Sequence, residues 1–340
     1  MPRSDRDVHG GTHKAVHAAG GICAALDLGT NNCRLLVATP DGGVSSSSFK
    51  VMDSFSRIVR LGEGVNQTGV LSEEAMERTL VALRACQKKL SRYAITSKRF
   101  VATEACRRAT NGAAFIEHVR SELGLHIDII SSEEEARLAF LGCASLLDSD
   151  TSRALVFDIG GGSTELMWVD IGNDGKHRII DWLSIGYGVM NLSDTFGGSN
   201  FADAVFSDMV SMLSEKMQPF DAKNSIRNAV AEGSVQLLST SGTVTTLAAI
   251  HLDLPRYDRT RIDGIRLKVS DIRNTTSRLH TMRPSERFNH PCIGPERADF
   301  IMSGCAIFEA IGALWPADQI RIADRGVREG IILSLIEQGV

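Results

Sequence analysis

The stretch VFDIGGGSTELMWV at residues 156–169 indicates how the chain folds. Apolar residues before its glycines predict a strand over 154–158, and those after them predict a returning strand over 165–169. Residues 160–164, three glycines followed by serine and threonine, predict the tight turn between the two strands. The unit is therefore a strand, a glycine turn and a second strand.

A second copy of this unit lies earlier in the chain, in AALDLGTNNCRLLVA at residues 24–38. It predicts strands over 22–28 and 34–38 on either side of a Gly-Thr-Asn-Asn turn. In both copies the first strand ends in Asp-x-Gly. Two similar halves indicate two similar domains with a ligand cleft between them.

Strands alternate with amphipathic helices in both halves, which is typical of an α/β fold. The polar segment 148–153 separates the halves, so we predict a disordered tail over 1–21, a first domain over 22–148 and a second over 149–324. The remaining predicted strands are 44–51, 99–103, 125–130, 177–183 and 319–323. The predicted helices are 72–90, 113–123, 132–147, 202–217, 243–251, 269–281, 296–314 and 327–336.

The composition limits the classes of partner. The 340 residues carry a formal net charge of -4, which gives no general attraction to nucleic acid or to an anionic membrane. Seven cysteines are dispersed without zinc spacing, as expected of reduced thiols in the cytoplasm. No segment approaches the 18 uninterrupted apolar residues of a membrane span, so none is predicted.

The two glycine turns suit phosphate binding. A glycine turn between strands lets successive backbone N–H groups face one concavity, where no Cβ keeps an anion away. The hydroxyls of Thr30, Ser163 and Thr164 add donors. Asp27 and Asp158, at the strand ends, offer the oxygen ligands that Mg²⁺ prefers. Neither a G-x-x-x-x-G-K-[ST] loop nor a G-x-G-x-x-G fingerprint occurs, which argues against a P-loop or dinucleotide enzyme.

Five segments together resemble a known family. In chain order they are AALDLGTNNCRLLVA, ISSEEEARLAFLG, VFDIGGGSTELMWV, STSGTVTTLAA and IADRGVREGII. They are similar to the motifs of the exopolyphosphatase/guanosine pentaphosphate phosphohydrolase family. The resemblance implies two ribonuclease-H-like domains of the actin-like ATPase superfamily, in the short, two-domain form. It also implies that a C-terminal helix, 325–340, returns to the first domain.

The resemblance further implies roles for single residues. Glu135 matches the family's catalytic glutamate, which would deprotonate the attacking water, although Ser132 and Glu135 also form a capping-box pattern. Glu165 matches an acidic residue expected to bind the metal with Asp158, and Arg107 matches an arginine expected to hold a phosphate. The residues expected to bind phosphate are Asp27, Gly29, Thr30, Asn31, Arg34, Asp158, Gly160, Gly161, Gly162, Ser163, Thr164, Ser241, Gly242 and Thr243.

Two local patterns, at Ser241 and Asp324, have a second interpretation, and a third, the acidic run 133–135, lies at a helix start. Ser241 precedes a predicted helix and either caps it or helps to bind an anion. Asp324 either caps the last helix or lines the cleft beside Arg325. The acidic run 133–135 at a helix start is expected to be held ionised by the helix dipole.

Together these features predict a metal-dependent exopolyphosphatase, which hydrolyses the terminal phosphoanhydride of inorganic polyphosphate and releases orthophosphate. The expected cofactor is Mg²⁺, with Mn²⁺ as the alternative and a monovalent cation such as K⁺ as a further candidate. Hydrolysis of guanosine pentaphosphate (pppGpp) is the alternative function, and a non-catalytic alarmone sensor or an actin-fold kinase is weaker. The protein is expected to be a cytoplasmic homodimer that binds neither nucleic acid nor membrane.

Overall fold

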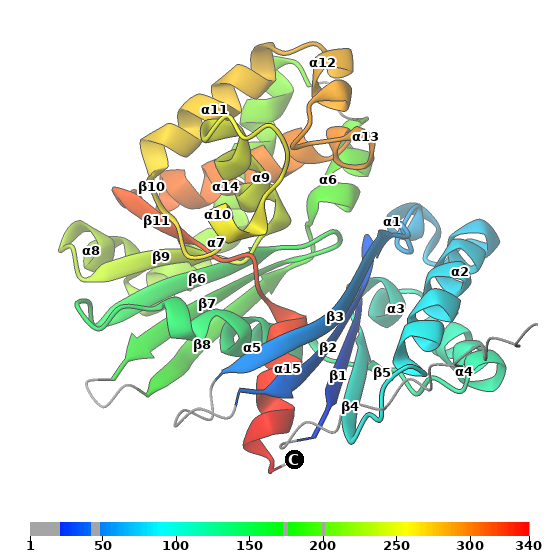
Figure 1. The fold of residues 1–340 in the computed structure, drawn as a ribbon. Helices are drawn as coiled ribbons and strands as arrows, with labels where there is room; N and C mark the ends of the chain where they lie inside the picture. The colour runs from blue at the N-terminus through cyan, green and yellow to red at the C-terminus, as the bar shows by residue number, and fades with distance from the viewer. Residues whose placement is uncertain (1–20, 42–47, 173–175, 199–200, 340) are drawn as a thin grey trace, which may run out of the picture.

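A computed structural model describes residues 21–41, 48–172, 176–198 and 201–339. The predicted tail, apart from Gly21, lies outside these residues. The first sheet has the order β3-β2-β1-β4-β5 (Figure 1). Its first three strands are antiparallel, and β4 and β5 run parallel to β1. Its strands are β1 (Cys23–Leu28), β2 (Asn32–Pro40), β3 (Phe49–Ile58), β4 (Ser97–Ala102) and β5 (Asp128–Ile129).

The second sheet repeats this plan in the order β10-β11-β9-β6-β7-β8. An antiparallel run of three strands again precedes two parallel ones, and β10 adds an antiparallel edge. The strands are β6 (Arg153–Ile159), β7 (Thr164–Ile171), β8 (His177–Ile185), β9 (Val235–Ser239), β10 (Arg266–Lys268) and β11 (Gln319–Ile322). The repeated strand order confirms the predicted fold class, two ribonuclease-H-like domains of the actin-like type.

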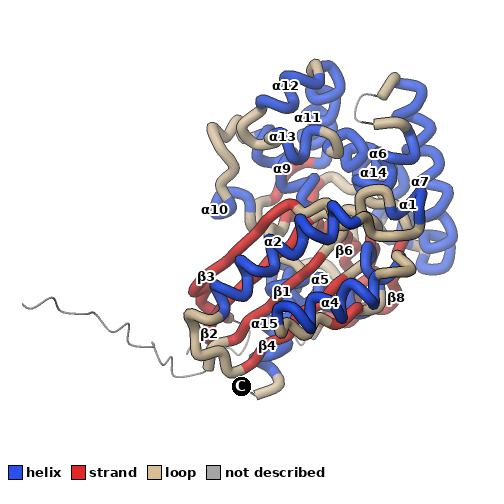
Figure 2. The backbone as a smooth tube through the Cα atoms, turned by 90° about the vertical axis from the view of Figure 1, so that its right-hand side faces the viewer, coloured by secondary structure: helices blue, strands red, loops and turns tan. Residues whose placement is uncertain are grey.

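The first sheet is covered on both faces. One face packs against α2 (Glu73–Leu90) and α4 (Gly112–Leu123), which lie in front of the sheet in Figure 2. The other face packs against α5 (Ser132–Cys143) and α15 (Val327–Glu337). The C-terminal helix therefore returns to the first domain, as predicted. Two short helices, α1 (Val65–Thr68) and α3 (Glu104–Arg108), complete this domain.

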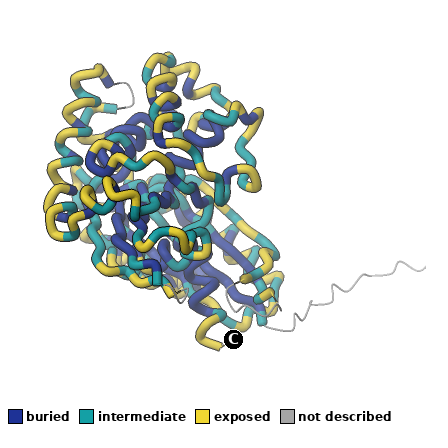
Figure 3. Tube along the Cα trace, turned by 90° about the vertical axis from the view of Figure 1, so that its left-hand side faces the viewer, coloured by how far each residue is buried: buried dark blue, intermediate teal, exposed yellow. Residues whose placement is uncertain are grey.

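The second sheet places its helical layer on one face, where Leu155, Phe157 and Leu166 belong to the core. Its other face packs on α5, through Phe140 and Cys143. Helix α5 thus lies between the two sheets, and Figure 3 shows buried segments gathered along the strands and inner helices. The other helices are α6 (Val189–Phe196), α7 (Asp203–Asn224), α8 (Ile226–Ala231), α9 (Gly242–His251), α10 (Arg259–Ile262), α11 (Val269–Thr281), α12 (Pro284–Asn289), α13 (Pro295–Ala298) and α14 (Ile301–Leu314).

Four predicted elements differ from the structure by more than two residues at one end, among them the helix predicted over 202–217, which is α7 (Asp203–Asn224). The strand predicted over 44–51 begins instead at Phe49 and runs to Ile58, because it pairs along the whole of β2; residues 42–47 lie outside the described chain. The strand predicted over 125–130 is two residues long, because only Val101 and Ala102 of β4 pair with it. The helix predicted over 132–147 ends at Cys143 and continues as a 3₁₀ turn.

The helix predicted over 296–314 is two helices. The N–H of Phe300 donates to the carbonyl of Arg297 at 2.9 Å, a three-residue turn that separates α13 from α14. The apolar periodicity continues through this break and does not reveal it. Strands β9 and β10 and the short helices α1, α3, α6, α8, α10 and α12 were not predicted, because each spans too few residues for a clear period.

Candidate active site

The two glycine turns meet at a cavity of about 410 Å³, a size typical of small-ligand sites. Its walls come from both sheets, from the start of α9 and from the start of α15. Thus the predicted cleft is present, and elements far apart in the sequence line it. The expected site residues that line it are Asp27, Gly29, Thr30, Asn31, Arg34, Glu135, Asp158, Gly160, Gly161, Gly162, Ser163, Gly242 and Thr243.

The two hairpins are built alike. The N–H of Gly29 donates to the carbonyl of Asn32 at 2.8 Å, and that of Gly160 to the carbonyl of Ser163 at 2.9 Å. The strand register is also the same, with Asp27 opposite Arg34 in one hairpin and Asp158 opposite Glu165 in the other. Because opposite residues share a face, each hairpin places a pair of charged groups on one side of its sheet.

The second turn forms a nest for an anion. The carbonyls of Gly160 and Gly161 accept from the N–H groups of Val189 and Met190, at 3.0 and 2.8 Å. The carbonyl of Gly162 accepts from the amide of Asn191 at 2.6 Å. Because the C=O and N–H of a trans peptide point in opposite directions, the N–H groups that follow these carbonyls point away from α6, and the residues that carry them line the cavity.

Glycine is required where the two turns approach each other. A Cβ on Gly161 would lie 3.1 Å from Cβ of Thr30, and one on Gly162 would lie 2.7 Å from Oγ1 of Thr30. A larger residue at Gly162 would force the side chain of Thr30 to shift, and one at Gly161 would be in tight contact with it. The glycines therefore serve both the nest and the contact between domains.

Two aspartates, Asp27 and Asp158, lie in the part of the cavity wall that the strands β1 and β6 form. Burial raises the pKa of Asp158 to about 6, although the charge of Arg34 opposes the rise. Burial likewise raises the pKa of Asp27, against the opposing charge of Arg34. Carboxylates with raised proton affinity and few protein partners are ready to accept a cation.

Glu165 is buried, at 2% exposure, and is not among the described residues that line the cavity. Its carboxylate accepts from the hydroxyl of Ser184 at 2.9 Å. Burial, together with the charge of Asp158, raises its pKa to about 7. Glu165 is therefore not a solvated charge on the strand surface, whereas its metal role remains a prediction.

Glu135 lines the cavity from the first turn of α5. Its pKa is raised well above the usual range, first by burial and next by the charge of Glu165, and Arg107 only partly opposes this. The helix dipole favours the ionised form of this acidic run, but at Glu135 burial and the charge of Glu165 act in the opposite direction. Glu134 differs from Glu135, because hydrogen bonds from Arg137 and Arg99 lower its pKa and favour its ionised form.

Arg107 binds protein groups rather than facing the cavity. Its guanidinium donates to Glu104 at 2.6 and 3.0 Å, to the carbonyl of Ile130 at 2.7 Å and to Glu135 at 3.2 Å. Its role as a phosphate ligand stays a prediction, and these contacts favour positioning of Glu135. Arg108, the next residue and a second candidate to hold a phosphate, donates to Asn66 at 2.7 Å.

Of the two serine caps proposed from the sequence, the one at Ser241 is present and the one at Ser132 is not. Ser131, not Ser132, caps α5, so the proposed capping box at Ser132 and Glu135 is wrong and Glu135 is free of a capping duty. Ser241 does cap α9, through the N–H of Thr243 at 3.0 Å. The hydroxyls of Ser241 and Thr164 point to backbone carbonyls, and neither residue is among the described residues that line the cavity.

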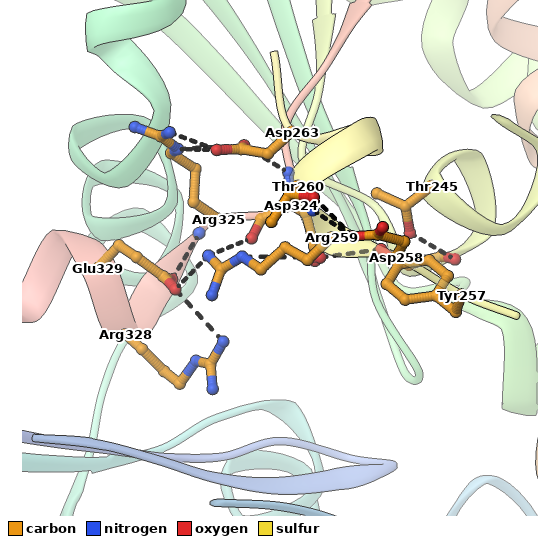
Figure 4. Close-up of polar contacts among 12 residues, drawn as sticks. Thr245, Tyr257, Asp258, Arg259, Thr260, Asp263, Asp324, Arg325, Arg328 and Glu329 are labelled. Carbon is orange, nitrogen blue, oxygen red and sulfur yellow. Dashed lines mark hydrogen bonds and ion pairs between the residues drawn. The ribbon is translucent and has the colours of Figure 1, made fainter. Parts of the chain in front are cut away.

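Asp324 does not cap the last helix. Gly326 is the N-cap residue of α15, and its N–H donates to Glu329 at 2.9 Å. Asp324 instead accepts from the phenol of Tyr257 at 2.9 Å and lines the cavity, as its second interpretation proposed. Figure 4 shows this network, in which Arg259 lies between Asp324 and Glu329.

A cluster of arginines lines the same cavity as the aspartates, and sequence reasoning missed most of it. Burial, with the nearby charge of Arg34, lowers the pKa of Arg297. Burial also lowers the pKa of Arg328, and Arg34 adds to that effect. Buried cations that repel one another favour an anion between them. Arg328 lies in the motif IADRGVREGII, whereas Arg259 and Arg297 stand in segments without a recognisable pattern.

The residues present fit a hydrated divalent cation. No group of three or more His, Cys, Asp or Glu side chains with metal-binding geometry occurs among the described residues. Mg²⁺ commonly takes only one or two carboxylates and fills its other positions with water and substrate phosphate. Asp158 and Asp27, both in the cavity wall, match that donor set.

Fold and site together define a two-domain enzyme of the actin-like fold that acts on phosphoryl groups. A model of the Ppx/GppA phosphatase family matches residues 37–338, and this chain belongs to that family. Within the described part of the chain, no helix has the length and apolar character of a membrane span.

Relatives support this assignment along nearly the whole chain. Exopolyphosphatase 2 of Mycobacterium tuberculosis is 30% identical over 322 residues, which cover 92% of this chain and 98% of that protein. The crystal structure of the Aquifex aeolicus Ppx/GppA family member is 27% identical, with a TM-score of 0.75 over 94% of this chain and 98% of that one. An exopolyphosphatase from Cytophaga hutchinsonii, 23% identical, shares the fold with a TM-score of 0.82 over 94% and 99%.

Proposed function

We propose that this protein is a metal-dependent exopolyphosphatase, which hydrolyses the terminal phosphoanhydride of inorganic polyphosphate. The observation that carries the proposal is Glu135, a buried glutamate of raised proton affinity, in the wall of a cavity that two glycine turns and an arginine cluster also line. A relative named exopolyphosphatase, similar over nearly the whole chain, supports the choice of substrate.

The protein groups divide the work of the reaction. N–H groups of the second turn and the arginines Arg34, Arg297 and Arg328 hold the anionic substrate. Glu135 accepts the proton of an attacking water as the new P–O bond forms, and the bridging P–O bond breaks with its electron pair going to the shortened chain. Mg²⁺, when held by Asp158 and Asp27, supplies neutralising charge for the phosphate oxygens.

Hydrolysis of pppGpp is the second candidate. Tyr257 and Phe300 line the same cavity as the arginines, and the guanidinium of Arg297 lies 5.9 Å from the centre of the Tyr257 ring. Aromatic faces beside cations suit a nucleobase that carries phosphates. The reaction at the terminal phosphate would be the same.

The test is orthophosphate release from long inorganic polyphosphate and from pppGpp, each with Mg²⁺ and with EDTA. We expect faster release from polyphosphate, dependence on Mg²⁺, and a loss of at least about 100-fold in Glu135→Gln, since a positioned base contributes this much. Glu133→Gln, an exposed glutamate on the same helical turn, is the matched control and should keep full turnover. Unchanged turnover in Glu135→Gln would show that another group activates the water.

We also propose that the protein acts as a cytoplasmic homodimer. The dispersed, buried free cysteines among the described residues support a reducing compartment. Light scattering of the purified protein tests the oligomeric state, and a mass equal to that of one chain would contradict it.

A further inference from the structure

Glu104 and Glu135 share one arginine unequally. Nε and Nη2 of Arg107 both donate to the same oxygen of Glu104, at 3.0 and 2.6 Å. Nη2 also donates to Glu135, at 3.2 Å, and this hydrogen bond is longer than those that the guanidinium makes with Glu104 and Ile130. Glu104 therefore holds Arg107 more closely than Glu135 does.

The backbone sets this arrangement. Glu104 and Arg107 are three residues apart on α3 and so lie on one face of it. Nη1 of Arg107 donates to the carbonyl of Ile130 at 2.7 Å, just before α5 begins. Arg107 thus joins α3 to the segment that carries Glu135.

Glu104 also packs against the second glycine turn. It lines the cavity, whereas Arg107 is not among the described residues that do. A Cβ on Gly162 would lie 3.0 Å from Cγ of Glu104. Glu104 consequently contacts the phosphate nest on one side and the partner of Glu135 on the other.

The charges around Glu135 come from several elements. Besides Arg107 on α3, Glu165 on β7 and Asp27 on β1 act on it, and both of these are acidic. A planar guanidinium binds a carboxylate best as a fork, with two parallel hydrogen bonds. If Arg107 forked onto Glu135, both oxygens would be occupied and the carboxylate would be a weaker base.

We propose that Glu104 is a positioning residue that keeps Arg107 from forking onto Glu135, so that Glu135 retains a free carboxylate oxygen for the attacking water. The proposal rests on the proposed role of Glu135 as the base. It deepens that function because it gives Glu104, a second acidic residue of the cavity wall, a role that is separate from the binding of phosphate or metal.

The experiment measures kcat and KM for long inorganic polyphosphate in Glu104→Ala and Glu104→Gln. We expect kcat to fall about 10-fold in Glu104→Ala, and less in the isosteric Glu104→Gln, whose amide oxygen still accepts from Arg107. KM should stay the same or fall, because an anion leaves the wall of an anion-binding cavity. A fall in kcat with a rise in KM would indicate general damage and overturn the proposal.

The same substitution in an Arg107→Lys background shows whether the effect passes through Arg107. Lysine keeps the charge but cannot fork, so Glu104→Ala should then change kcat by no more than about twofold. An equal loss in both backgrounds would mean that Glu104 acts without Arg107, and the proposal would be wrong.

Two controls separate the possible failures. Glu122→Ala removes a comparable ion pair, 2.7 Å from Arg84 and outside the cavity, and should leave kcat unchanged. If Glu135→Gln remains active, the proposed base has failed; if Glu135→Gln is inactive but kcat in Glu104→Ala is within twofold of the parent, only the role of Glu104 has failed.

Discussion

At the scale of single residues, the site concentrates acidic groups that the protein does not neutralise. Asp27, Asp158, Glu165 and Glu135 come from three strands and one helix, and burial raises the pKa of each. Keeping such groups together costs folding stability, as is common at functional sites. The cost falls when a cation or a bound proton removes the repulsion.

Glu165→Gln should therefore stabilise the protein at high pH when measured in EDTA. The folded-state pKa of Glu165, about 7, lies above the usual 4.5. The stabilising effect of its neutral form is thus complete below about pH 4.5 and is lost as the pH rises through 7. We expect the variant to gain on the order of 2 kcal/mol at pH 8 and nothing near pH 4.5, measured by urea unfolding.

The control variant is Glu134→Gln, for which the change in folding stability should have the opposite sign. Hydrogen bonds and charges from Arg137 and Arg99 lower the pKa of Glu134, so its charged form stabilises the folded state above its usual pKa. Glu134→Gln should lose stability at pH 8 and change little at pH 3. A gain that did not depend on pH in Glu165→Gln would show that its charge is already neutralised in the folded protein.

At the scale of elements, the crossing of α5 and α15 depends on two glycines. A Cβ on Gly330 would lie 1.9 Å from the carbonyl oxygen of Leu138 and 3.2 Å from the backbone nitrogen of Gly142. A Cβ on Gly142 would lie 2.1 Å from the carbonyl oxygen of Gly326. The two helix backbones are therefore in direct contact, which brings the first turns of both helices, with Glu135 and Arg328, to the same cavity.

Gly330→Ala should destabilise the protein by about 3 kcal/mol or more, because backbone atoms, not a flexible side chain, oppose the new methyl group. Urea unfolding measures the loss, and turnover should fall as α15 shifts. Gly312→Ala is the matched control within a helix: its Cβ meets only the end of Arg273, so stability should stay within about 1 kcal/mol. Equal stability of Gly330→Ala and the parent would mean that the helices can separate at no cost.

At the scale of the whole molecule, the chain passes between domains where β11 leads into α15. Arg259 of the second domain donates to the carbonyl of Asp324 and, at 3.0 Å, to the buried carboxylate of Glu329. Arg325 is paired with Asp263 beside them. These contacts, drawn in Figure 4, hold the segment between β11 and α15 against the cavity wall.

Arg259→Leu should weaken the junction between the domains. Burial alone would raise the pKa of Glu329, but Arg328 and Arg259 hold it below its usual range. Removing one of these partners from a carboxylate that is 4% exposed should cost about 1–3 kcal/mol at pH 7, measured by urea unfolding. The loss should shrink as the pH falls and Glu329 becomes protonated. Arg256→Leu, an exposed arginine nearby, should be neutral.

Much of this protein can be predicted from its sequence. Two strand–turn–strand units ending in Asp-x-Gly predict two α/β domains, a cleft and phosphate-binding turns. Local patterns suffice for this, because a turn that needs glycine and strands that need apolar residues leave their marks within about fifteen residues. The motif that contains Glu135 is equally local.

Only the tertiary structure decided what the other charged groups do. The direction of Arg107 depends on Ile130 and Glu135, and the burial of Glu165 depends on the packing of its sheet. The arginine cluster combines residue 34 with residues 297 and 328, and Phe300 enters the cavity through a helix break that periodicity hides. Desolvation and charge coupling arise between segments far apart in the chain, so no local pattern encodes them.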